Sequence, residues 1–214
     1  MNAFPLALYL VASASYAVHF ARRNEPAGRI ATVTLVLGAL THAFVIGMQT
    51  MQVGHIPFVG TTGAVSAFVC LLALAYLYSE MMTDERAMGV FVVPLMTLLQ
   101  IIPAITNSVA ERPPILDSPW FAVHVLSLLC AYASFALACV VGVTYVLLFK
   151  ELKAKHLGFF YARLPSLQVL DQMNSRAVSV GWFFLTLGLV VGAVWLLQVQ
   201  SNTTDPRIQA MSLL

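Results

Sequence analysis

The chain has 214 residues, of which 60% are hydrophobic and only 9% are charged, and its mean hydropathy is +0.86. So little charge cannot cover the surface of a water-soluble domain, which indicates an integral membrane protein. Since a membrane-spanning helix needs roughly 20 apolar residues, this length accommodates about six spans and excludes a sizeable soluble catalytic domain. The formal net charge of +2 is too small and too scattered to indicate nucleic acid as a partner.

Six apolar runs, separated by polar breaks, predict an all-α transmembrane helix bundle that forms a single domain over residues 1–214. The predicted spans lie near residues 4–21, 30–51, 61–78, 88–105, 120–149 and 177–199. The first run has no basic n-region and no small-residue cleavage site, so we expect it to be a retained span. Gly188 and Gly192 form a GxxxG pattern in the sixth run, and close helix packing is its expected role.

Alternate breaks contain nearly all of the basic residues, and this asymmetry predicts the orientation of the bundle. Of the eleven Lys and Arg residues, nine lie in one set of breaks: Arg22, Arg23, Arg29, Arg86, Lys150, Lys153, Lys155, Arg163 and Arg176. Arg112 and Arg207 lie in the other set. The positive-inside rule places the first set in the cytoplasm, so both termini are expected to face outward, into the periplasm beyond a bacterial inner membrane. His19 and His156 lie on the basic side, where interfacial or solvated roles are expected.

The remaining polar groups exclude several classes of enzyme. Cys70, Cys130 and Cys139 lie in apolar runs without CxxC or CxxCH spacing, which argues against a thiol-disulfide oxidoreductase and a c-type cytochrome. No HExxH pattern, Gly-rich phosphate loop or carboxylate pair within a span is present, so hydrolysis and phosphoryl transfer lack their usual groups. Asp171 and Arg176, before the sixth span, are expected to form a solvated or capping pair.

Three histidines are placed where they could bind a metal centre. His124 lies about one turn into the outer end of the fifth span, beside Trp120 at the expected interface. His55 lies in an outer loop, so both imidazoles are expected on the same side of the membrane. His42 lies about nine residues, or roughly 14 Å, below the outer surface. A neutral imidazole at that depth can bind haem iron, and the alternative is a hydrogen bond to a neighbouring helix.

Several segments have the sequence pattern of one known family. The clearest runs from LPSL at 164–167 through Leu170, Asp171 and Arg176 to GWFFLTLG at 181–188 and GAVW at 192–195. WFAVHV at 120–125, followed by YAS at 132–134, is similar to a helix that begins with an external histidine. THA at 41–43 and GHIP at 54–57 match segments around the second and third spans. Together these segments resemble the cytochrome c assembly family, the CcsA-type haem-handling membrane proteins.

The resemblance implies a membrane protein that binds haem b near the outer face and delivers it to apocytochrome c with a partner membrane subunit. His124 matches the family's external axial haem ligand. We count His42, His55 and Trp120 as further haem-binding candidates, with His42 as the other axial candidate. The resemblance implies no catalytic residue in this chain, which would at most be part of a haem lyase, or cytochrome c synthetase, complex.

Two features depart from the family's pattern. The tryptophan-rich external loop of the family corresponds here to QSNTTDPR at 200–207, which keeps Asp205 and Pro206 but contains no tryptophan. The family also usually continues through two further spans that contain a second external histidine. From the second departure we expect either a fragment or a reduced relative of the family. The loss of the tryptophans also fits the haem-biosynthesis-associated (HemX-like) branch. Two other functions stay open: a small transporter with His42 as its midplane polar group, and a cofactor-free scaffold subunit of an assembly complex.

Overall fold

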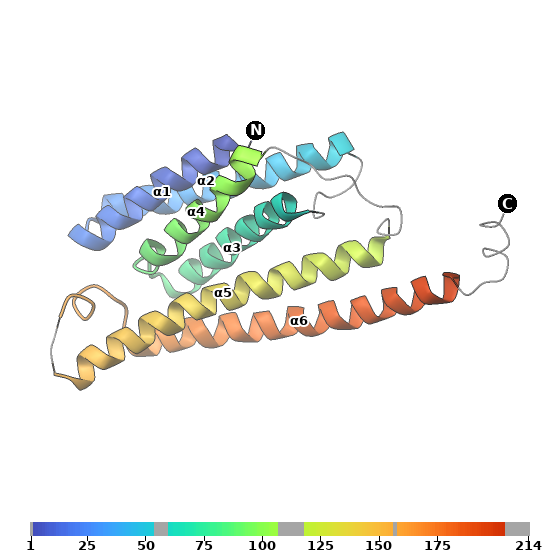
Figure 1. Ribbon diagram of the computed structural model, residues 1–214. Helices are drawn as coiled ribbons and strands as arrows, with labels where there is room; N and C mark the ends of the chain where they lie inside the picture. Colours follow the sequence, from blue (N-terminus) through green and yellow to red (C-terminus); the bar gives the residue numbers. More distant parts are fainter. Residues whose placement is uncertain (1, 54–59, 107–117, 156–157, 204–214) are drawn as a thin grey trace.

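The computed structural model describes residues 2–53, 60–106, 118–155 and 158–203. Within these ranges the chain forms six α-helices and no strand, which confirms the predicted all-α class (Figure 1). The helices are α1 (Ala3–Arg22), α2 (Glu25–Val53), α3 (Thr61–Thr83), α4 (Gly89–Thr106), α5 (Pro119–Lys153) and α6 (Leu167–Thr203). All six are long and apolar enough to cross a membrane.

One end of the bundle contains residues 23–24, 84–88, 154–155 and 158–166, which lie between helices, and we call it the basic end. Arg23 and Asp84 adopt the left-handed conformation there, with φ of 51° and 53°, and so end α1 and α3. Asn24 then caps α2, because its Oδ1 accepts a hydrogen bond from the Ala27 N–H at 3.3 Å. The other end, where α1 begins and α6 ends, is called the distal end (Figure 1).

Three helices extend five residues or more beyond an end of the span predicted from hydropathy. α2 begins at Glu25 instead of Ile30. α6 begins at Leu167 instead of Ala177, and the Ser166 Oγ accepts a hydrogen bond from the Val169 N–H near its start. α3 continues past Tyr78 to Thr83. Hydropathy marks only the part of a helix that lies among apolar groups, whereas backbone hydrogen bonding continues through polar residues until a cap ends the helix.

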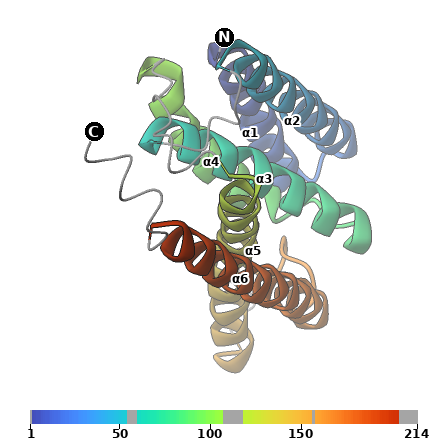
Figure 2. The ribbon, with the colours of Figure 1, turned by 90° about the vertical axis from the view of Figure 1, so that its right-hand side faces the viewer.

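The helices pack as a group of four with a hairpin beside it. α1 packs against α2 and α4, α3 packs against α4 and α5, and α5 lies along α6 (Figures 1 and 2). Tyr9, Tyr16 and Tyr76 are fully buried within the group of four. The Tyr16 ring needs glycine at position 89, because a Cβ there would lie 2.3 Å from it. This arrangement places His42 inside the group of four and His124 on the hairpin.

Candidate functional site

His124 lies in the second turn of α5 and points onto α6 near the distal end. Its Nδ1 lies 2.7 Å from the carbonyl oxygen of Gly188. A Cβ at position 192 would lie only 2.4 Å from the same nitrogen, so the imidazole rests directly on the α6 backbone at Gly192. The GxxxG pattern therefore does provide close helix packing: Gly192 accommodates the His124 ring, and Gly188 accommodates the Leu128 side chain.

The Gly188 contact determines which nitrogen of His124 carries the proton. A carbonyl oxygen can only accept, so Nδ1 must be the donor, and the Nε2 of the neutral ring then holds a free lone pair. The structure gives Nε2 no hydrogen bond within the described ranges. Metal-binding histidines commonly have this arrangement, with one nitrogen donating to a carbonyl and the other free for the metal.

Aromatic side chains surround this end of the hairpin. Trp120 is 44% exposed and lies one turn before His124 on α5. Phe121 contacts Trp195 of α6, with ring centroids 5.2 Å apart. The Trp195 Nε1 is buried and has no hydrogen-bond partner among the described residues. Sequence reasoning noted Trp195 only within a family pattern, although its position three residues after Gly192 would place it beside His124.

His42 is fully buried and hydrogen-bonded at both ring nitrogens. Its Nδ1 lies 3.1 Å from the Tyr9 hydroxyl of α1, and its Nε2 lies 2.9 Å from the Ser66 hydroxyl of α3. These contacts join three helices within the group of four. His42 can bind a metal only if one of these hydrogen bonds is broken, which distinguishes it from His124. The third candidate, His55, lies outside the described residues.

A buried carboxylate lies at the basic end, where sequence reasoning placed none. Glu80 of α3 is 4% exposed. It accepts hydrogen bonds from the Tyr16 hydroxyl at 2.6 Å and from the Thr32 hydroxyl, and its carboxylate lies 3.7 Å from the Arg86 Nε. The span predicted from hydropathy covers residues 61–78 and so does not include Glu80. Glu80 lies only two residues after Tyr78, and no helix-breaking residue separates the two. This continuity was the sequence signal that the helix includes Glu80.

The described residues contain no group of three or more His, Cys, Asp or Glu side chains that could hold a metal ion. Cys70, Cys130 and Cys139 are free thiols. Among the described residues, His124 is therefore not part of a preformed cluster of metal-binding side chains.

Comparisons with known proteins agree with the helical pattern. The family model described as "Cytochrome C assembly protein" matches residues 2–202. Proteins named cytochrome c biogenesis protein CcsA are similar to the chain. The one from Guillardia theta is 23% identical over 75% of the chain and 60% of its own length. The one from Chlorella vulgaris is 25% identical over 75% of the chain and 62% of its own length. The one from Prochlorococcus marinus (strain MIT 9303) is 22% identical over 78% of the chain and 62% of its own length.

The chain thus spans about three fifths of the length of these relatives, at 60% and 62% of the first two. No solved structure matches it.

Proposed function

The chain belongs to the cytochrome c assembly protein family, and from this premise we propose that it acts in cytochrome c biogenesis by holding haem at the distal end of the α5–α6 hairpin. The observation that carries the proposal is the hydrogen bond between the His124 Nδ1 and the Gly188 carbonyl. This bond fixes the imidazole against α6 and leaves Nε2 free, so His124 would hold haem through its iron.

The surrounding residues fit a haem group. Trp120, Phe121 and Trp195 supply aromatic surface for a flat apolar macrocycle. The unpartnered N–H of Trp195 is a donor for a carboxylate such as a haem propionate. A site near the membrane surface also lets the propionates stay close to water while the ring contacts apolar side chains.

For the second axial position we prefer His55 to His42. The sequence places His55 in the loop after α2, on the same side as His124. His42 would have to give up its bond to Tyr9 or to Ser66, and a buried hydroxyl without a partner costs roughly 1–3 kcal/mol. Because the chain has no CxxCH attachment pattern, the haem would be held without a covalent bond to cysteine, and we propose that it is haem b.

Delivery requires further proteins. We propose that the protein lies in a bacterial inner membrane with the distal end facing the periplasm, and that it passes haem to apocytochrome c together with a partner membrane subunit. The basic residues at the opposite end support this orientation.

The test is the absorption spectrum of the protein purified in detergent after expression with ample haem. We expect a Soret band in the wild type and its loss in His124→Ala, with recovery when free imidazole is added to the variant. His19→Ala is the matched control, because the His19 Nδ1 also contacts a backbone carbonyl, at 2.9 Å from the Asn24 oxygen, but at the basic end. That variant should keep the Soret band.

A colourless wild type would contradict the proposal, and so would equal losses in the His124 and His19 variants. A colourless protein that supports solute flux into proteoliposomes would instead favour the transporter. A colourless protein that co-purifies with a membrane subunit would favour the scaffold.

A further inference from the structure

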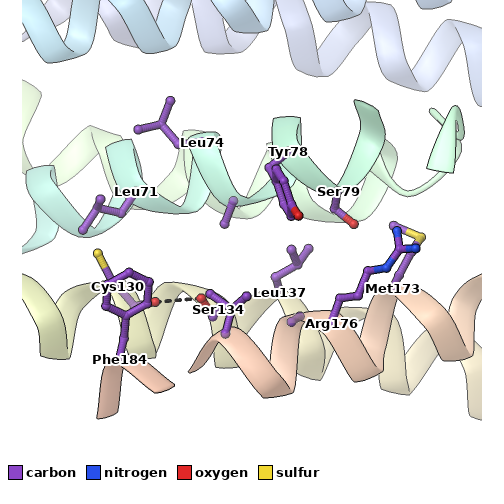
Figure 3. A pocket seen from close by; sticks show the side chains of 13 residues that line it. Leu71, Leu74, Tyr78, Ser79, Cys130, Ser134, Leu137, Met173, Arg176 and Phe184 are labelled. Atoms are coloured by element: carbon purple, nitrogen blue, oxygen red, sulfur yellow. Dashed lines mark hydrogen bonds between the residues drawn. The ribbon is translucent and has the colours of Figure 1, made fainter. Parts of the chain in front are cut away.

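A second candidate site lies in a cavity of about 350 Å³ between α3, α5 and α6 (Figure 3). Leu71 and Ser79 of α3 line one wall, Arg176 and Phe184 of α6 line the opposite wall, and Ser134 of α5 lies between them. Neither His124 nor His42 lines the cavity. It is therefore separate from the proposed haem site.

The cavity is polar at one end and apolar at the other. Two stretches of helix line the cavity from end to end: Ser79 back to Leu71 on α3, and Arg176 to Phe184 on α6. Each is about 12 Å long along the helix axis. Because the two helices run in opposite directions, Ser79 and Arg176 lie together toward the basic end, and Leu71 and Phe184 lie together deeper in the bundle. Figure 3 shows this division, with the Arg176 side chain extending toward Ser79.

Arg176 is the one charged side chain among the residues that line the cavity. Within the described ranges, the ion pairs are those of Arg86 with Glu25, Glu80 and Asp84, so the expected pairing of Arg176 with Asp171 is not formed. The guanidinium is thus available to an anion. Its planar set of donors matches the geometry of phosphate oxygens, and basic pockets between membrane helices bind anionic lipid headgroups.

We propose that this cavity binds an anionic phospholipid from the leaflet at the basic end. The phosphate contacts Arg176 and the nearby Ser79 hydroxyl, and an acyl chain extends between α3 and α6 toward Leu71 and Phe184. A free phosphate ion would leave this apolar part unfilled. The lipid also fills the space where α3 and α6 make few direct contacts, and so attaches the hairpin to the group of four.

The experiment measures binding of phosphatidylglycerol and of phosphatidylcholine to the delipidated full chain in detergent, by native mass spectrometry. We expect the wild type to prefer phosphatidylglycerol by about fivefold. This is the effect typical of one basic side chain that attracts an anionic lipid near a membrane surface. Arg176→Gln should lose this preference, and Arg176→Lys should retain only part of it, because the charge remains but the planar set of donors is lost. Arg29→Gln is the matched control, because Arg29 is exposed near the same end and does not line the cavity.

Val180→Trp tests the apolar part, because Val180 lines the cavity and is 39% exposed, so a larger side chain can fill the cavity without entering the core. This variant should bind both lipids more weakly, and its circular dichroism should match that of the wild type.

Equal binding of the two lipids by the wild type would overturn the proposal, as would the same loss in Arg29→Gln. Inorganic phosphate that displaces phosphatidylglycerol completely would identify a free anion as the occupant. Haem that displaces the lipid, with a Soret band lost in Val180→Trp, would identify haem as the occupant. Each of these results contradicts a lipid site.

Discussion

His124 and His42 both lie within helices, but they differ in which ring nitrogens are already hydrogen-bonded. His124 uses only Nδ1, toward the Gly188 carbonyl, whereas His42 uses both nitrogens, toward Tyr9 and Ser66. The sequence places both residues in apolar surroundings. For His42 it is compatible with two roles, binding of haem iron and a hydrogen bond to a neighbouring helix. Only the neighbouring helices decide between these roles, because the partners lie 33 and 24 residues away in the chain for His42 and 64 for His124.

At the residue scale, the packing of His124 on Gly192 gives a prediction. Gly192→Ala places a Cβ 2.4 Å from the His124 Nδ1, so the ring must move and its hydrogen bond to Gly188 must weaken. We expect the affinity for haem to fall about tenfold or more. Losses of this size are typical when a metal-binding histidine loses the hydrogen bond of its other ring nitrogen. Haem titration followed by absorbance measures this affinity.

Gly47→Ala is the matched control, because a Cβ there has no other atom within 4 Å. Both substitutions raise helix propensity equally, so the difference between them reports the histidine contact alone. Unchanged haem affinity in Gly192→Ala would show that the position of the ring does not matter for binding.

At the scale of helices, the extension of α3 past Tyr78 creates the tightest polar connection of the group of four. Glu80 joins α3 to Tyr16 of α1, to Thr32 of α2 and to Arg86 in the connection to α4. Hydropathy ends the span before this residue, because an isolated glutamate lowers the local average. The carboxylate is nevertheless buried, since three neighbouring elements supply the donors that compensate for its loss of water.

We predict that Glu80→Ala lowers the free energy of unfolding by about 3 kcal/mol, the lower range for removing one partner of a buried ion pair. The substitution leaves the buried Tyr16 hydroxyl without its acceptor and removes the buried ion-pair partner of Arg86, which keeps only the exposed partners Glu25 and Asp84. Titration with sodium dodecyl sulfate, followed by circular dichroism in mild detergent, measures the change.

Glu25→Ala provides the comparison, because the Glu25 side chain is 66% exposed and lies 3.5 Å from the same Arg86. Exposed ion pairs contribute at most about 1 kcal/mol. If the two substitutions have the same effect, Glu80 does not stabilise the helix group through its buried contacts.

At the scale of the whole molecule, α6 is the helix with the smallest buried share of its apolar stretch. Only 17% of the apolar window of α6 is buried, against 44% for α3 and for α5. α6 therefore depends mainly on its packing against α5 for its position. That position in turn sets the backbone of Gly188 and Gly192 beneath His124.

The distribution of basic residues predicts that the basic end lies in the cytoplasm and the distal end outside. Alkaline phosphatase, which is active only outside the cytoplasm, should be active when fused at the carboxyl terminus. The same enzyme inserted in the connection between α5 and α6 should be inactive, because Lys155 and Arg163 hold that connection inside. The reverse pattern of activity would contradict this orientation, because it would show that the distal end and His124 lie on the cytoplasmic side.

The sequence by itself determined the helical class, the number of spans and the family pattern, because these depend on the hydropathy and residue order of each segment alone. It also brought His124 and the glycines of α6 to notice, but as unrelated features. The tertiary structure decided that Gly188 and Gly192 support the His124 ring, that His42 is hydrogen-bonded on both sides, and that Glu80 is buried. Each of these depends on a side chain of another helix, and helix packing, not local sequence, sets which groups meet.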